Sequence, residues 1–246
     1  MDVPEYDHSH GDLSQTHWSI IEKAADRNHP ESKTALNALC ETYWKPVYGY
    51  IFFQNRNPHE AADLTQFFFS RVIEKNFFGA ADRNKGRFRA YLRVAVKNFL
   101  HSHNKSKCAL KRGGGRYHIS LDAFREQFPD LIEPSNEMTS EMLFDIQWAR
   151  TILANVLELL AKYYRDKSLD TLFSKLRPFL MGESGAITYK QMALELGSSE
   201  GAVKMSVTRM RKKLKKILRE EIARTVADPA QIDEEIEHLM AVLGRR

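Results

Sequence analysis

The sequence TYKQMALELGSSEGAVKMSVTRMRKKLKKIL, residues 188–218, decides the fold of the carboxyl-terminal half of this chain. Within it, Ala193 is followed four residues later by Gly197 and six residues after that by Val203. A small residue lets two helices approach, a glycine accepts the strained backbone of a tight turn, and an apolar residue packs the second helix onto the first. The spacing therefore predicts a helix-turn-helix, with Ser199 as the N-cap of its second helix.

The second helix of this motif is expected to have one apolar face and one cationic face. Its apolar positions recur every three or four residues, at Val203, Val207, Met210 and Leu214. The positions left outward are Lys204, Met205, Thr208, Arg209, Arg211 and Lys212. Because a recognition helix presents such side chains to base edges and phosphates in the major groove, the pattern favours binding of duplex DNA over a simple core hairpin.

The distribution of charge indicates a polyanionic partner. The 246 residues carry 37 Lys plus Arg and 32 Asp plus Glu, a net charge of +5. Residues 83–116 contain eleven Lys or Arg, residues 201–219 contain eight, and neither segment contains an acid. Without these nineteen cations the remainder of the chain has a net charge of −14. Since like charges repel on a solvated helix, two acid-free segments favour nucleic-acid binding.

An acidic segment separates the two basic ones. Residues 122–145 hold seven Asp or Glu, one Arg and two prolines, and three glycines precede them at 113–115. Such a composition is typical of a linker. It predicts a disordered tail at 1–15, a first domain at 16–112, an acidic linker at 113–140, a second domain at 141–227 and a helical extension at 228–246.

Apolar residues recur at helical intervals through both expected domains. Helices are predicted at 36–53, 58–75, 88–107, 141–164 and 169–180. No segment alternates as a half-buried strand does, and twelve Gly and eight Pro are few for a turn-rich β protein. We therefore expect an all-α fold of two small helical domains.

The helix expected at 88–107 mixes aromatic with cationic side chains. Its aromatic residues include Phe88, Tyr91 and Phe99, and its polar face carries Arg89, Arg93, Lys97 and Asn98. Rings among cations suit unstacked bases, since each stacking contact contributes about 1–3 kcal/mol. The alternative is that Tyr91 and Phe99 belong to the core, and the spacing gives both interpretations equal weight.

Composition disfavours several classes of protein. No apolar stretch approaches the length of a membrane span, and residues 1–11 are too polar and acidic for a signal peptide. The two cysteines, Cys40 and Cys108, cannot build a disulfide framework, which favours a cytoplasmic protein. No Gly-rich phosphate loop is present, and no cofactor or metal site is expected.

Three motifs carry a resemblance to a known family: AADLTQ at 61–66, GRFRAYL at 86–92 with VKN at 96–98, and ITYKQMA at 187–193 with SEGAVK at 199–204. They resemble sigma factors of the sigma-70 superfamily, of the extracytoplasmic-function (ECF) type. In that family the first motif docks onto core RNA polymerase, the second opens and reads the minus-ten element, and the third reads the minus-thirty-five element. The expected domains then correspond to sigma regions 2 and 4.

The resemblance implies roles for individual residues. Asp63, Leu64 and Gln66 would contact polymerase. The minus-ten strand would be held by Asp82, Arg83, Asn84, Lys85, Phe88, Arg89, Tyr91, Arg93, Lys97 and Asn98. The minus-thirty-five duplex would be read by Ser199, Glu200, Gly201, Lys204, Met205, Thr208, Arg209 and Lys212. Two departures from the family are Phe67, where an acid is usual, and Met205-Ser206, where a polar residue and Arg are usual.

The resemblance further implies a protein that performs no bond chemistry and is not an enzyme. Its partners would be core RNA polymerase and promoter DNA, as duplex and as melted single strand, and a regulatory partner would be an anti-sigma protein or a kinase. Capture of extruded bases would stabilise the open promoter, because unstacking costs a few kcal/mol and a binding pocket offsets that cost.

Two other functions fit parts of the sequence. A stand-alone helix-turn-helix regulator would use residues 188–218 and leave the motif at 61–66 unexplained. A metal-dependent nuclease would draw on His101, His103 and Cys108. Residues two apart on a helix, however, point about 200° apart, and no nearby carboxylate completes a metal site.

The segment after Asp228 and Pro229 is expected to form a last helix. Its apolar stripe would be Ile232, Ile236, Leu239 and Leu243, with the acids Asp233, Glu234, Glu235 and Glu237 elsewhere. The expected role is packing on the second domain, and the alternative is self-inhibition, in which these acids cover the recognition helix.

Overall fold

A computed structural model describes residues 17–81, 87–110, 138–181, 187–226 and 228–244 of the chain. The regular structure in these ranges is entirely helical, so the predicted all-α class is confirmed for them. The tail at 1–15, the loop residues Asp82, Arg83, Asn84 and Lys85, and most of the acidic segment lie outside the described residues.

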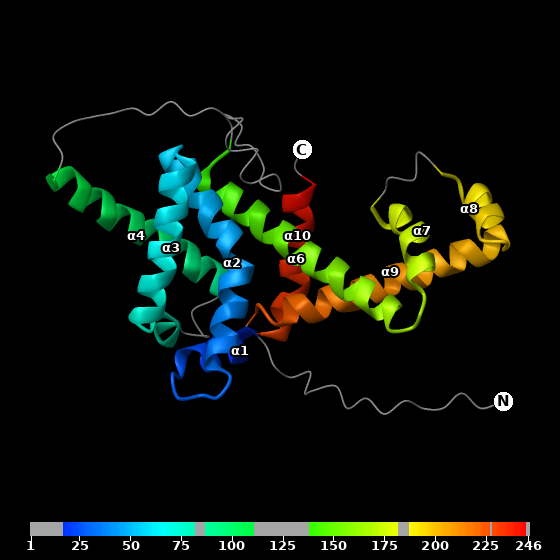
Figure 1. Ribbon diagram of the computed structural model, residues 1–246, viewed down its shortest axis with the longest axis horizontal. Helices are drawn as coiled ribbons and strands as arrows, with labels where there is room; N and C mark the ends of the chain where they lie inside the picture. Colours follow the sequence, from blue (N-terminus) through cyan, green and yellow to red (C-terminus); the bar gives the residue numbers. More distant parts are fainter. Residues whose placement is uncertain (1–16, 82–86, 111–137, 182–186, 227, 245–246) are drawn as a thin grey trace.

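The helices of the first half lie at one end of an elongated molecule (Figure 1). They are α1 (His17–Ala25), α2 (Ser32–Asn55), α3 (Pro58–Glu74), the short 3-10 helix η1 (Phe77–Ala80) and α4 (Phe88–Leu110). The expected break between α2 and α3 is present. The side chain of Asn57 accepts a hydrogen bond from the backbone N–H of Glu60 at 3.0 Å, and Pro58 occupies the first helical turn. This is a standard N-terminal arrangement.

The helices of the second half begin with α6 (Ser140–Arg165), and α7 (Asp170–Met181) follows it. The helices α8 (Tyr189–Glu195) and α9 (Glu200–Ala223) come next, and the 3-10 turn η3 (Pro229–Gln231) leads into α10 (Ile232–Leu243). Figure 1 shows α9 running from the α8 end of the molecule back toward α1, with α10 upright behind α6.

The largest helix contact joins α2 to α6, which stand on opposite sides of the expected linker. Gly49 of α2 permits this contact, because a Cβ there would lie 3.3 Å from Cγ of Gln147 and 3.4 Å from Cγ of Leu143. Trp148 of α6 and Tyr43 of α2 are fully buried in the same core, which continues into α9 and α10. The two halves thus share a core, and their division into separate domains stays a prediction.

Helix α10 packs on α6 and α9 through a stripe that differs from the expected one. Ile232, Leu239 and Val242 are buried, whereas Ile236 is half-buried. The fourth inward position belongs to Glu235, which is only 1% exposed. The expectation that all acids of this helix avoid the packed face is therefore wrong for Glu235, because the helix is rotated to bring that carboxylate against a buried cation.

No helix in the described part of the chain combines the length and the apolar character that crossing a membrane requires.

Candidate nucleic-acid interface

The start of α8 and the turn from α8 to α9 are each fixed by local contacts, and the turn has the glycine and the serine cap that its sequence predicts. Thr188 and Gln191 form a capping box, in which each backbone N–H donates to the other side chain, at 2.9 and 3.2 Å. Gly197 has a positive φ of 59°, a conformation that glycine adopts without strain. Ser199 caps α9, since its Oγ accepts a hydrogen bond from the N–H of Ala202 at 3.2 Å.

The inner face of α9 fixes the orientation of its outer face. Val203, Val207 and Met210 are buried, as expected, and Leu214 is half-buried. Tyr189 at the start of α8 stacks on Phe179 of α7, with ring centroids 4.7 Å apart. The outward Arg211 donates a hydrogen bond to the backbone carbonyl of Phe179 at 2.9 Å, so it also ties α9 to α7. Helices α7 and α8 therefore hold the predicted recognition helix α9 in place.

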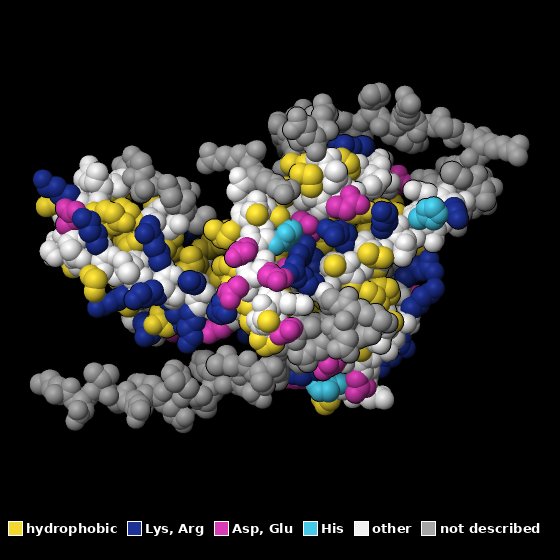
Figure 2. Space-filling view, turned by 180° about the vertical axis from the view of Figure 1, so that it is seen from behind, with side chains coloured by type: hydrophobic (Ala, Val, Ile, Leu, Met, Phe, Trp, Pro, Cys, Tyr) yellow, Lys and Arg dark blue, Asp and Glu magenta, His cyan; other side chains and the backbone are white. Residues whose placement is uncertain are grey.

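The outer face of α9 is open to solvent along the turns that follow the glycine. The residues predicted to read the minus-thirty-five element are all exposed, namely Ser199, Glu200, Gly201, Lys204, Met205, Thr208, Arg209 and Lys212. Figure 2 shows Lys and Arg side chains gathered over the lobe that α7, α8 and α9 form. The structure thus brings these eight residues together on one surface.

Lys204 is the most constrained cation of this surface. Its Nζ lies 2.6 Å from the Glu200 carboxylate and 5.7 Å from the ring centroid of Tyr189. The hydrogen bond and charge of Glu200 raise the pKa of Lys204 above its ordinary value and lower the pKa of Glu200. Beside this pair Met205 is 55% exposed, an apolar side chain that suits the methyl group of thymine.

The predicted minus-ten residues of α4 divide into buried and exposed members. Phe88 is completely buried among core rings, including Tyr43 at 5.3 Å, so this conformation does not offer it to a DNA strand. Tyr91 is half-buried, stacks on Phe77 at 4.7 Å and donates its hydroxyl to the Phe77 carbonyl at 3.2 Å. Lys97 and Asn98 are exposed.

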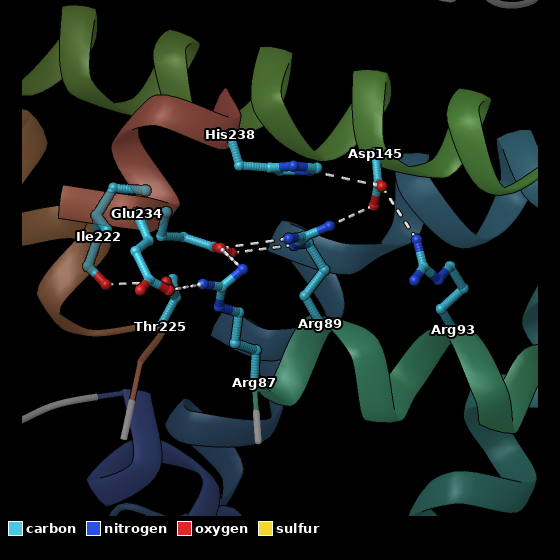
Figure 3. Close-up of polar contacts among 9 residues, drawn as sticks. Arg87, Arg89, Arg93, Asp145, Ile222, Thr225, Glu234 and His238 are labelled. Atoms are coloured by element: carbon cyan, nitrogen blue, oxygen red, sulfur yellow. Dashed lines mark hydrogen bonds and ion pairs between the residues drawn. The ribbon is translucent and has the colours of Figure 1, made fainter. Parts of the chain in front are cut away.

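Arg89 and Arg93 in the first turns of α4, and Arg87 just before it, are paired with carboxylates, as Figure 3 shows. Arg89 lies at the centre: its Nη1 is 2.5 Å from Asp145 of α6, and its Nε is 3.1 Å from Glu235 of α10. Arg93 reaches the second oxygen of Asp145 at 3.0 Å. Arg87 contacts Glu235 at 2.9 Å and also Glu234 at 2.8 Å. We call these six residues the arginine–carboxylate cluster.

The centre of the cluster is shielded from water, whereas Glu234 at its edge is exposed. Arg89 is 5% exposed, and its guanidinium lies 4.6 Å above the ring of Trp148. Burial by itself would lower the pKa of Arg89, but the charges of Glu235 and Asp145 outweigh it and raise that pKa. His238 of α10 completes the surroundings, with Nε2 3.5 Å from Asp145. Arg89 is thus a charged side chain, and each of its three nitrogens donates to a carboxylate inside the protein.

The predicted polymerase-binding residues lie on α3. Asp63 and Gln66 are exposed, whereas Leu64 is buried at 5% exposure and packs in the core. Phe67, which stands in place of the usual acid, is 46% exposed. Its ring lies 5.7 Å from the ring of Phe99 and 5.7 Å from the Arg71 guanidinium carbon. The candidate docking surface therefore presents an aromatic ring between polar groups.

Sequence reasoning missed the residues that hold the α4 arginines: Asp145, Trp148, Glu235 and His238. One signal is available in the sequence, because Glu235 lies three residues after Ile232 and four before Leu239, in phase with the apolar stripe. A carboxylate at such a position predicts a buried cation as its partner. The identity of that partner depends on the packing of α4, α6 and α10, which no local pattern contains.

Within the described residues, no group of three or more His, Cys, Asp or Glu side chains is arranged to hold a metal ion. The ring of His103 stacks on Phe99, with centroids 6.2 Å apart. Comparison of the chain with family models, with curated proteins and with solved structures finds no match.

Proposed function

We propose that this protein is a sigma factor of the ECF type, which binds core RNA polymerase and directs initiation at specific promoters. In this proposal α8 and α9 read the minus-thirty-five duplex, and α4 with the loop before it holds the melted minus-ten strand. The exposed residues Asp63 and Gln66 of α3 contact polymerase.

The observation that carries the proposal is the α8–α9 unit. Its turn, its caps and its buried face have the geometry of a helix-turn-helix, and its open face bears an acid-free run of cations from 201 to 219. A second basic helix, α4, belongs to the same molecule at the opposite end (Figure 1). A protein that grips duplex DNA and a melted strand at once needs two such surfaces.

The α9 surface supports both direct and electrostatic readout. Arg209 and Lys212 can contact phosphates or guanine, and Met205 can contact a thymine methyl group. Each base contact of this kind discriminates by about 1–3 kcal/mol. Because Met205 is apolar, we expect a thymine to be favoured at the position that it meets in the upstream element.

The decisive test reconstitutes the protein with core RNA polymerase and sequences the transcript starts from genomic DNA. We expect stable binding to core and a set of starts that share an upstream and a minus-ten motif. Absence of core binding, or starts identical to those of core alone, would refute the proposal.

Matched variants locate the two surfaces. Arg209→Ala should weaken binding of the holoenzyme to promoter duplex and flatten the dependence of log K on log salt by about 0.9 for a phosphate contact. Lys33→Ala removes the same charge from an exposed position on α2 and serves as the control. The double variant Asp63→Ala/Gln66→Ala should reduce core affinity, with Asn37→Ala, an exposed change on α2, as its control.

A stand-alone helix-turn-helix regulator is the second candidate. The observation that favours it is that the α9 face is open, while the arginines of α4 are engaged by carboxylates. Tight and sequence-specific binding of the purified protein to a promoter duplex in the absence of polymerase would select this candidate. It leaves the exposed Asp63 and Gln66 without a role.

A further inference from the structure

We propose that α10 acts as an internal competitor of nucleic acid: its Glu234 and Glu235, together with Asp145 of α6, occupy the arginine surface of α4 on which the phosphates of a single strand bind. The inference rests on the proposed function in taking the start of α4 to be the strand-binding surface. It adds that this surface is already occupied, and that the strand must displace α10 to reach it.

The first argument is the chemistry of the contacts. A carboxylate and a phosphate present oxygen pairs of similar spacing, and arginine binds both through parallel N–H donors. Glu235 accepts from Nε of Arg89 at 3.1 Å and from Nη2 at 3.3 Å, the bidentate mode that a phosphate would use. Arg87 contacts two carboxylates through one nitrogen each, Glu235 through Nη1 and Glu234 through Nη2. The α10 carboxylates thus stand where phosphate oxygens would stand.

The second argument is the register of α4. Arg89, Arg93 and Lys97 are four residues apart and form one row along the helix. Arg89 is covered by α10, Arg93 is half-buried against Asp145, and Lys97 is exposed. A strand that binds along this row would therefore find Lys97 accessible at one end and Arg89 occupied by carboxylates at the other. Figure 3 shows the covered end, with α10 above Arg87 and Arg89.

The third argument concerns how strongly α10 is held in its position over the arginines. Desolvation of buried ions offsets most of their attraction, so a buried ion pair is held more weakly than its distances suggest. Apart from the cluster, α10 is held by three buried apolar side chains, by the partly buried Ile236 and Leu243, by the ring of His238 beside Trp148, and by an exposed ion pair between Asp233 and Arg219. Helix α10 is also short, only 12 residues near the end of the chain, and such an element can separate locally at a lower free-energy cost than the central helices.

The test measures binding of a fluorescein-labelled oligo-dT strand to the full-length protein by anisotropy. Glu235→Gln should bind on the order of tenfold more tightly than the unmodified protein, the effect of one charge-assisted hydrogen bond. The slope of log K against log salt should steepen by about 0.7 for each additional phosphate that the arginines bind. Glu237→Gln removes the same charge from the exposed side of α10. It should increase strand affinity much less than Glu235→Gln does, because it changes only the net charge and frees no arginine.

A further substitution separates a specific effect from a general one. Arg87→Gln in the Glu235→Gln background should reduce the increase in affinity, because Arg87 is one of the two cations that lose Glu235 as a partner. Equal increases for Glu235→Gln and Glu237→Gln, or an increase that survives Arg87→Gln in full, would overturn the proposal.

Hydrogen exchange on the unmodified protein gives a result that does not depend on how a variant folds. On addition of the oligo-dT strand, the amides of 232–243 should exchange faster, while those of α6 around 152–160 stay protected. Unchanged or slower exchange in α10 with the strand bound would contradict the displacement.

These results are independent of the polymerase assay. If Glu235→Gln increases strand affinity and the protein does not bind core, the competitor is real and the sigma assignment fails. If the protein redirects polymerase and neither α10 exchange nor strand affinity responds, the sigma assignment holds and the competitor is refuted.

Discussion

Arg89 is a cation held almost entirely out of water, and its surroundings explain how that is possible. Two carboxylates and the face of Trp148 replace its hydration. A buried charge that loses its partners costs far more than the pair contributes, because the remaining ion is left without solvent or counter-charge. The residues around Arg89 therefore form a unit whose members cannot be changed singly without a large loss of stability.

We predict that Arg89→Met lowers the free energy of unfolding by about 3–5 kcal/mol, because it leaves the carboxylates of Asp145 and Glu235 facing an apolar side chain. The triple variant Arg89→Met/Asp145→Asn/Glu235→Gln should recover more than half of that loss. Urea unfolding followed by circular dichroism measures both. A triple variant no more stable than Arg89→Met would show that the ion pairs are not the source of the effect.

His238 predicts a pH dependence of stability. Burial and the charge of Arg89 lower the pKa of His238 below 6.5, although Asp145 opposes the shift. As the pH falls below 6.5, the unfolded chain takes up a proton at this residue before the folded chain does, so stability should decline. His238→Gln should remove that part of the decline. The same dependence on pH in both proteins, measured by urea unfolding between about pH 7.5 and 5.5, would contradict the prediction.

At the scale of elements, α8 and α9 show how far local sequence determines structure. The glycine in the left-handed region and the serine cap depend on residues within a few positions, and both are present as predicted. The capping box at the start of α8, which is not among the features predicted from the sequence, is equally local. Helix α10 shows the opposite. Its stripe includes Glu235 because a cation on α4 stabilises a carboxylate at that place, and periodicity counts only apolar residues.

The serine cap offers a test at this scale. Ser199→Ala removes the acceptor for the Ala202 N–H and should cost about 1 kcal/mol of stability. Because the cap orders the first turn of α9, duplex affinity should fall with it. Ser206→Ala is the control, since its hydroxyl bonds back to the Ala202 carbonyl within the helix. Stability is measured by calorimetry and affinity by titration with duplex DNA. Equal losses of stability and affinity in Ser199→Ala and Ser206→Ala would disprove the expectation.

At the scale of the whole molecule, the contact of α2 with α6 joins the two halves. Helix positions along each half are predictable from sequence: 36–53 lies within Ser32–Asn55, and 141–164 lies within Ser140–Arg165. The contact is not predictable, because the close approach at Gly49 becomes visible only when Gln147 and Leu143 are placed beside it. The composition of the expected linker predicts a boundary between two parts of the chain. It does not predict which helices on its two sides contact each other.

A large side chain at position 49 should separate the halves. Gly49→Leu cannot be accommodated beside Leu143 and Gln147, and we expect it to raise the radius of gyration measured by X-ray scattering while helix content stays unchanged. Gly49→Ala is the graded control, since its Cβ needs neighbours to move by only a few tenths of an ångström. A Gly49→Leu protein as compact as the unmodified one would show that the shared core does not depend on this approach.

The arginine–carboxylate cluster also constrains how this sequence can change in evolution. Asp145 and Glu235 stand 56 and 146 positions from Arg89 in the chain, yet each is costly without the others. If Arg89 is replaced by an apolar residue, the stability that is lost returns only after both carboxylates have been replaced too. Intermediates with one or two of the three changes are less stable than the present sequence and than the fully substituted one. Sequences that share an ancestor with this one should therefore inherit the three residues together or lack all three.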